Sequence, residues 1–330
     1  MRALPRTCLL LLGGLSVTAC AKTPPSIAAS DASSPLRLER RIPLPEVKGR
    51  IDHLAIDEAG QRLFVAEVDN GTVDEIDLAT GKVLGRIGGL HEPQGVGYLS
   101  AQRELVVASG DGTVRFFASD RRPLARIDLG DDADDVRIDP RNGHVLVGYG
   151  SGGIATIDPA THRLLARLSL SGHPEGFQLI GSRIFVNIAD RGSIVAADLD
   201  RGKVQATWPT GLHRLNFPMA VAADSDRILI AYRLPATLAS IRVANGGVTF
   251  LQPTCGDSDD LYVDKSRVFV ICGAGHVDVQ RQGSGETIVR VATAPGARTG
   301  ILSAQRRKLY VAAPARGGPA AIWELAIGPS

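Results

Sequence analysis

The chain has 330 residues, with 37 basic and 35 acidic side chains and a formal net charge of +2. This near-balance excludes the strongly basic surface by which proteins bind nucleic acids, so nucleic acid is not an expected partner. Aromatic residues make up only 5% of the chain and glycines number 37, which is typical of closely stacked sheets joined by tight turns. Length alone allows one large domain or two ordinary ones.

Residues 1–19 have the composition of an export signal. Positive charge is followed by a short apolar run and then by Val17–Cys20. The run is too short to span a bilayer, which favours a cleaved signal peptide. Val17–Cys20 resembles the bacterial lipobox, and this resemblance implies cleavage before Cys20 and lipidation of that residue. The alternative is ordinary signal-peptidase cleavage at the small residues Ala19–Ala21, which would release a soluble exported protein.

Residues 20–35 are predicted to be a flexible tether, because they contain two adjacent prolines and many alanines and serines. Either form of cleavage places the protein in the bacterial cell envelope, in the periplasm. No acidic residue directly follows Cys20, and resemblance to enterobacterial lipoproteins then favours the outer membrane over the inner one. The membrane is therefore an expected partner only through the lipid anchor.

The rest of the chain, residues 36–330, repeats itself seven times with a period of about forty residues. The units begin at Asp52, Gln94, Asp134, Glu175, Phe217, Asp259 and Arg298. A period of this length, with strand patterning inside each unit, is typical of a radial array of β-sheets. We therefore predict one all-β domain.

The first unit illustrates the pattern that the others follow. Strand-forming runs at 53–57, 63–67, 72–77 and 82–87 are separated by Gly, Asn and Asp at hairpin spacing. This predicts blades of four antiparallel strands. Because no stretch of ten or more residues has apolar spacing of 3.6, helices should be almost absent.

The last unit has room for only three strands, the third of them at Ala321–Ile327. Leu36–Leu44, which precedes the first unit, is similar to the fourth strand of the other units. We therefore predict that the N-terminal strand completes the last blade and pairs an otherwise open edge.

The segment Leu63–Ile87 resembles the YVTN-type repeat of the YncE-like β-propeller proteins, from its second strand to its fourth. The resemblance extends over nearly everything from about residue 36, although the fifth and seventh units are degenerate. It implies a seven-bladed β-propeller. It says little about function, because propellers host many unrelated activities. No nucleophile elbow, phosphate loop or dinucleotide fingerprint accompanies it, and no catalytic residue is predicted.

The loops that lead into the first strand of each unit should surround the mouth of the central channel on one face, here called the top face. Polar residues gather in these mouth loops. The predicted ligand-binding set is Asp52, His53, His91, Asp134, His173, Glu175, His213, Asp259 and Arg298. One interpretation is a ligand or metal site formed by imidazoles and carboxylates from different units. The other is that these residues cap strands and bond to nearby backbone.

Charge and metal chemistry at this mouth remain open. Acidic residues cluster in the mouth loops of the third and sixth units, with Arg50, Arg214 and Arg298 as candidate counter-charges. Mixed histidine and carboxylate ligation suits Zn or Cu, but no ligand spacing in the sequence requires a metal. No cofactor is expected, and a divalent metal is possible.

Two cysteines, Cys255 and Cys272, remain once Cys8 is cleaved away and Cys20 is modified. Export to an oxidising compartment predicts a disulfide between them. By loop-closure entropy such a crosslink is worth about 3 kcal/mol. The alternative is a metal centre in which the two thiolates join His213 and His276.

The leading hypothesis is an exported, non-enzymatic, monomeric propeller that binds a partner protein or a small ligand at the mouth of its channel. Two alternatives stay open. One is a metal-dependent propeller hydrolase or lactonase, suggested by the histidines and carboxylates of the mouth loops. The other is a periplasmic metal or redox accessory protein, suggested by the histidines and the cysteine pair.

Overall fold

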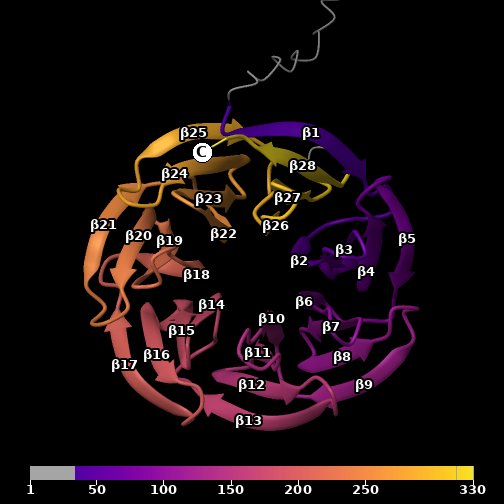
Figure 1. Ribbon diagram of the computed structural model, residues 1–330, viewed down its shortest axis with the longest axis horizontal. Helices are drawn as coiled ribbons and strands as arrows, with labels where there is room; N and C mark the ends of the chain where they lie inside the picture. The colour runs from indigo at the N-terminus through magenta and orange to yellow at the C-terminus, as the bar shows by residue number, and fades with distance from the viewer. Residues whose placement is uncertain (1–33, 317, 330) are drawn as a thin grey trace, which may run out of the picture. The chain divides into compact units, whose positions relative to one another are not determined.

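The computed structural model describes residues 34–316 and 318–329. They form seven four-stranded antiparallel sheets arranged as blades around a central axis (Figure 1). The fold is a seven-bladed β-propeller, as predicted. Helical structure in the described ranges is limited to two three-residue 3-10 turns, η1 (Val68–Asn70) and η2 (Ala189–Arg191). Within those ranges, no helix has the length and apolar character needed to cross a membrane.

Each blade runs outward from the axis, and blade 1 begins with β2. The innermost strands are β2 (Ile51–Asp57), β6 (Pro93–Leu99), β10 (Ala133–Ile138), β14 (Phe177–Ile180), β18 (Arg214–Val221), β22 (Ser258–Asp264) and β26 (Gly300–Ser303). The second strands are β3 (Arg62–Glu67), β7 (Glu104–Ser109), β11 (Val145–Tyr149), β15 (Arg183–Ile188), β19 (Arg227–Leu234), β23 (Arg267–Cys272) and β27 (Lys308–Ala313).

The outer half of each blade follows the same order. The third strands are β4 (Thr72–Asp77), β8 (Thr113–Phe117), β12 (Gly153–Asp158), β16 (Ser193–Asp198), β20 (Ala236–Arg242), β24 (His276–Arg281) and β28 (Ala321–Ile327). The outermost strands are β5 (Lys82–Ile87), β9 (Pro123–Asp128), β13 (Arg163–Ser169), β17 (Lys203–Pro209), β21 (Val248–Pro253), β25 (Thr287–Ala292) and, for the seventh blade, β1 (Leu36–Pro43).

The ring closes through the two ends of the described chain. Strand β1 pairs antiparallel with β28, from Leu36 opposite Ile327 to Pro43 opposite Ala321. Arg40 crosses this seam and donates to the carboxylate of Glu324 at 2.5 Å. The prediction that the N-terminal strand completes the last blade is confirmed. The predicted signal peptide at 1–19, Cys20 and nearly all of the 20–35 tether lie outside the described residues.

The core lies between the faces of neighbouring blades. The second and third strands are almost wholly buried, whereas outermost strands such as β13 are mostly exposed. Phe116 of blade 2 packs with Val145 and Val147 of blade 3 in one buried cluster. Each sheet therefore buries both faces, which explains why β-branched and aliphatic residues dominate the inner strands.

Near the axis the innermost strands of adjacent blades approach one another closely. A Cβ atom on Gly95 of β6 would lie 1.7 Å from the carbonyl oxygen of Asp134, so only glycine fits there. This contact fixes the backbone of Asp134, which begins the third unit of the repeat.

Cys255 and Cys272 form a disulfide, as predicted. Cys255 precedes β22 and Cys272 ends β23. Because the two sulfur atoms bond to one another, they do not form the alternative centre with His213 and His276. The crosslink ties the mouth loop of blade 6 to the second strand of the same blade.

Candidate functional site

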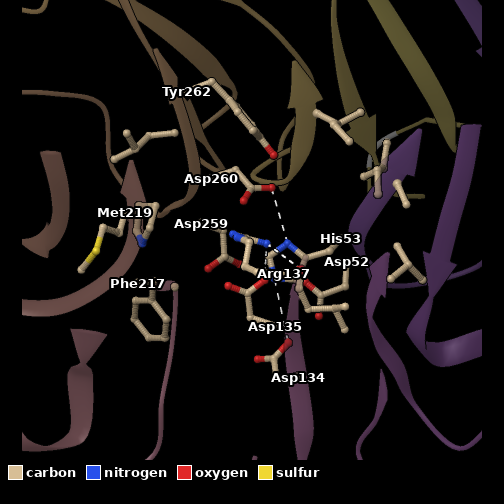
Figure 2. A pocket seen from close by; sticks show the side chains of 18 of the residues that line it. Asp52, His53, Asp134, Asp135, Arg137, Phe217, Met219, Asp259, Asp260 and Tyr262 are labelled. Carbon is tan, nitrogen blue, oxygen red and sulfur yellow. Dashed lines mark hydrogen bonds and ion pairs between the residues drawn. The ribbon is translucent and has the colours of Figure 1, made fainter. Parts of the chain in front are cut away.

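A cavity of about 620 Å³ lies at the axis, lined by residues of the innermost strands and of the mouth loops (Figure 2). Six of the nine predicted site residues line it: Asp52, His53, Asp134, Glu175, Asp259 and Arg298. They come from five different blades, so the repeat has placed chemically different side chains at equivalent positions around one space.

His53 lies between carboxylates at the centre of this cavity. Its Nδ1 is 3.6 Å from Asp260 Oδ2 and its Nε2 is 3.9 Å from Asp134 Oδ1 (Figure 2). Burial acts to lower the pKa of His53, but the charges of Asp260, Asp52 and Asp135 outweigh burial and raise the pKa well above its usual value. The surrounding carboxylates therefore favour the protonated form of this imidazole.

The layer of side chains below the mouth is also charged. Asp135 is buried and forms an ion pair with Arg137, whose guanidinium lies over the Phe177 ring. Asp260 Oδ2 accepts a hydrogen bond from the backbone N–H of Gly300 at 2.9 Å. One oxygen of Asp135 is buried without a hydrogen-bond partner. Burial raises the pKa of Asp135, and the charge of Arg137 opposes that rise.

One part of the mouth, here called the paired side, consists of Arg50, Asp52, Arg233, Asp259 and Arg298. Arg50 pairs with Asp52, and Asp259 receives Arg233 at 2.7 Å and Arg298 at 2.9 Å. Burial raises the pKa of Asp259 to about 6, although Arg233 and Arg298 act to lower it. Here each carboxylate has an arginine within hydrogen-bonding distance.

The opposite part of the mouth, here called the unpaired side, consists of Asp134, His173 and Glu175. Among the described residues, Glu175 has no ion pair within 4.0 Å, and the only cation that close to Asp134 is His53. Burial, followed by the charge of Asp259, raises the pKa of Glu175 to about 8. Burial and the charge of Asp52 also raise the pKa of Asp134. Both shifts follow from carboxyl groups placed in a partly dry site where the opposing charges, His53 for both groups and Arg233 for Glu175, do not outweigh burial.

The remaining predicted residues lie in different places. His173 does not line the cavity itself, but it faces Asp134 and Glu175, and its Nδ1 is 2.6 Å from the carbonyl oxygen of Gly150. The side chain of His91 is exposed and lies outside the cavity lining. His213 packs against Tyr232, with ring centroids 5.1 Å apart, and is also outside the lining.

The sequence analysis missed Arg137 and Arg233, and it named Arg214 as a counter-charge although Arg214 is exposed and outside the cavity lining. Arg137 follows Asp135 by two residues on β10, so the alternation of a strand places both on one face; that signal could have found it. Arg233 lies near the end of β19, which is the second strand of its blade. The prediction considered only the loops before the first strands, so it could not include Arg233.

Together the fold and the site define a seven-bladed β-propeller with a charged cavity at its axis. No protein-family model matches the chain, and no curated protein matches it in sequence. Among solved structures, it is similar to a chain of hydrazine synthase from Kuenenia stuttgartiensis. The TM-score is 0.73 and the identity 16%, over 81% of this chain and 94% of that chain. At this identity the likeness shows the fold alone.

Proposed function

We propose that this propeller binds a small, positively charged ligand in the cavity at the mouth of its channel. The observation that carries the proposal is the lining of the cavity, where six carboxylic acids face four arginines and one histidine. Three of the acids, Asp134, Glu175 and Asp260, form no ion pair with an arginine of the described residues, and of these three Glu175 also lacks His53 as a partner. A volume of about 620 Å³ is in the range of small-molecule sites. Of the two kinds of partner expected from the sequence, a concave site of this size favours the small ligand over a protein.

The charge distribution supports a cation more than an anion. Burying a carboxylate costs free energy unless a cation or hydrogen bonds compensate it. At Glu175 and Asp134 the protein supplies little compensation, so a bound cation would supply the missing charge. An anion would meet arginines that already form ion pairs on the paired side.

The test is a thermal-shift and calorimetry panel on the purified full-length mature protein. The probes are ethanolamine, choline, succinate and divalent metal ions. We expect at least one cation to raise the melting temperature and succinate to have no effect. Glu175→Gln should weaken the response, whereas Glu286→Gln, at an exposed glutamate, should not. Stabilisation by succinate alone, or by no member of the panel, would overturn the proposal.

We also propose that the protein is an exported, lipid-anchored member of the YVTN-repeat family that works as a monomer in the periplasm, at the outer membrane. Three features support this: the repeat pattern, the lipobox-like Val17–Cys20, and a disulfide that suits an oxidising compartment. Mass spectrometry of the mature N-terminus tests the anchor. A diacylglycerol-modified Cys20 is expected, and an unmodified start at Lys22 would rule lipidation out. Light scattering tests the monomer.

A second candidate is metal-dependent hydrolysis, which the grouping of Asp134, His173 and Glu175 beside the cavity favours. Three protein ligands leave a coordination position for water, as in catalytic zinc sites. Protein incubated with Zn²⁺ would then hydrolyse lactones or esters, and a chelator would abolish the turnover. Metal binding without turnover would leave the binding function standing alone.

A further inference from the structure

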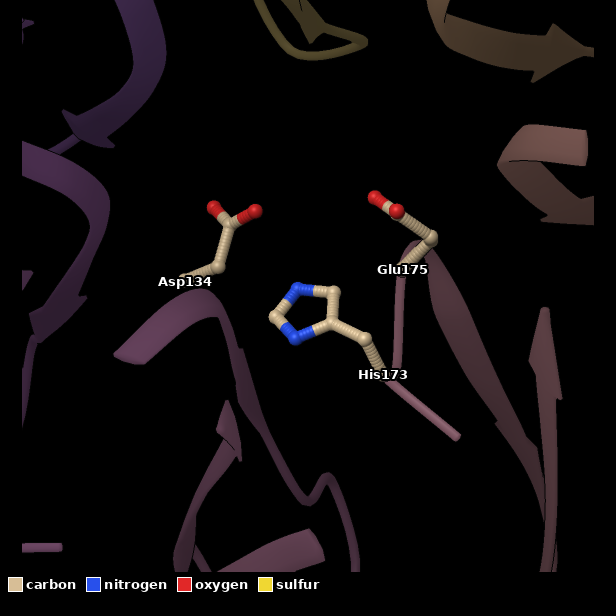
Figure 3. Close-up of side chains that lie close together, drawn as sticks. All are labelled: Asp134, His173 and Glu175. Atoms are coloured by element: carbon tan, nitrogen blue, oxygen red, sulfur yellow. The ribbon is translucent and has the colours of Figure 1, made fainter. Parts of the chain in front are cut away.

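We infer that Asp134, His173 and Glu175 bind one divalent transition-metal ion on the unpaired side of the mouth. This inference rests on the proposed function and names the class of its ligand. The three side chains come from two neighbouring blades, since Asp134 belongs to β10 and the other two precede β14. Figure 3 shows the imidazole between the two carboxylates, all turned toward one space.

The distances between the ligand atoms of the three residues are somewhat longer than those around a bound metal ion. One ligand atom from each residue lies within 4.8 Å of the other two. Two ligands bound to zinc at about 2.1 Å in tetrahedral geometry are about 3.4 Å apart. The ligand atoms therefore have to approach one another by at most about 1.4 Å, which rotation about the terminal torsions of the side chains can provide.

The orientation of His173 is the second, independent observation. Its Nδ1 is 2.6 Å from the carbonyl oxygen of Gly150. Because a carbonyl oxygen only accepts hydrogen bonds, Nδ1 carries the proton, and the lone pair of the neutral ring is on Nε2. Metal-binding histidines are held in this way, with one ring nitrogen donating to a carbonyl or carboxylate and the other free for the ion.

The surroundings offer these ligands few partners: the contact of Asp134 with His53 is 3.9 Å long, beyond hydrogen-bonding distance. Asp134 Oδ1 is buried and accepts no hydrogen bond from the described residues. Glu175 forms no ion pair among those residues, in contrast to Asp52 and Asp259 across the mouth. An imidazole with two carboxylates favours a first-row transition metal over Ca²⁺ or Mg²⁺, which prefer all-oxygen ligands.

The experiment is calorimetry with Zn²⁺ on the full-length mature protein, stripped with a chelator and dialysed. We expect one ion per chain. His173→Ala, Asp134→Asn and Glu175→Gln should each weaken binding by more than about tenfold, because each removes a ligand atom. His213→Ala is the matched control, since His213 packs on Tyr232 away from the cluster, and it should bind as the wild type does. Bound Co²⁺ should give a visible absorption spectrum that His173→Ala lacks.

The outcomes separate this inference from the proposed function. Zn²⁺ that binds equally to wild type and to all three ligand variants would overturn the metal site. If ethanolamine or choline binds and Glu175→Gln weakens it while no metal binds, the metal site fails and the proposed function stands. If neither metal nor organic cation binds, both fail. Circular dichroism of each variant shows whether weaker binding reflects lost ligands or lost structure.

Discussion

The two sides of the channel mouth solve the burial of charge in opposite ways. On the paired side Asp52 and Asp259 each have an arginine within hydrogen-bonding distance. On the unpaired side Asp134 and Glu175 face one another with only His173 between them (Figure 3). A buried carboxylate that has its own arginine is satisfied within the protein, whereas one without it retains affinity for a cation. The contrast thus separates residues that hold the mouth together from residues that remain available to a ligand.

The paired side is also anchored covalently. The disulfide holds Cys255, which is four residues before Asp259 in the same mouth loop, to the end of β23. The mouth loops of blades 3 and 4, which carry the unpaired side, contain no cysteine. The covalent restraint at the mouth therefore lies on the paired side, away from the three candidate metal ligands.

The largest effect that we expect comes from this anchor. The double variant Cys255→Ala/Cys272→Ala should lower the free energy of unfolding by about 3 kcal/mol, because it releases a crosslink between residues 17 apart. Denaturant titration measures the loss. A reducing agent should destabilise the wild type equally and leave the double variant unchanged. Zinc affinity should not change, and a large drop would show that the two sides are coupled.

Next is the removal of one arginine from the paired side. Arg233 bonds to Asp259, donates to the backbone oxygen of Ser258 and lies 3.8 Å from the centroid of the Phe217 ring. Arg233→Met should cost about 2 to 3 kcal/mol, because it leaves a half-buried carboxylate with one partner fewer.

The matched control is Arg201→Met. Arg201 pairs with Asp198 at 3.0 Å, but its side chain is 79% exposed, so the change should be within about 0.5 kcal/mol. Equal losses in the two variants would contradict the view that the arginines of the paired side stabilise the mouth through buried pairing.

The sequence predicted the fold in detail because a propeller repeats one unit, and an error in one copy is corrected by six others. The period, the four-strand unit and the closing strand all depend on hydrophobic alternation and turn residues, which are local signals. Even the incomplete seventh unit indicated that Leu36–Pro43 must pair with it, and the pairing of β1 with β28 confirms this.

The site was less predictable because it depends on the conformation of the mouth loops, where a shift of one residue along the chain changes the direction of a side chain. His173 is two residues before Glu175 and faces the cluster, whereas His91 is three residues before Gln94 and is exposed. Glu92, at the position that corresponds to His173, has a left-handed backbone with φ of 50°. The two histidines lie in similar sequences, but they differ by one position relative to the start of the unit, and the loop conformation leaves one facing the cluster and the other exposed.

A buried carboxylate away from the mouth tests whether a raised pKa alone makes a metal site. Glu67, at the end of β3, is 0% exposed, and its Oε1 has no hydrogen-bond partner. Thr72 donates to its other oxygen, and Arg86 lies 3.9 Å from that oxygen but donates its hydrogen bonds to Asp74. Burial raises the pKa of Glu67 to about 8, well above the usual value of a glutamate. No described histidine or cysteine joins Glu67 in a metal-binding cluster.

Glu67→Gln should therefore stabilise the protein at pH 8 by on the order of 2 kcal/mol and change little at pH 4.5. Between these values the unfolded chain loses the proton of Glu67 while the folded chain keeps it, so wild-type stability falls as pH rises. Denaturant titrations across this window measure the slope. Glu92→Gln, at an exposed glutamate, is the control with no change in slope. The zinc affinity of Glu67→Gln should equal that of the wild type. Weaker zinc binding by this variant would contradict the assignment of the metal site to the mouth.

The smallest expected effect bears most directly on the contrast between the two sides. Asp134→Asn removes a carboxyl group whose pKa is raised to about 8 by burial and by the charges of Asp52, Glu175 and Asp135, against the opposing charge of His53. In the presence of a chelator at pH 7 the variant should be more stable than the wild type by about 1 kcal/mol. The unfolded chain gains free energy by ionising Asp134 and the folded chain does not, whereas the variant loses only a 3.9 Å contact with His53 and no arginine pair.

The sign matters more than the size of this change. A ligand-binding carboxylate is held in place at a cost to stability, whereas a structural carboxylate contributes to it. Asp134→Asn should gain stability and lose zinc, and Arg233→Met should lose stability and keep zinc. If both variants are destabilised alike, then Asp134 is part of the same structural network as Asp259. The carboxylates on both sides of the mouth would then stabilise the fold, and the contrast between the two sides would be wrong.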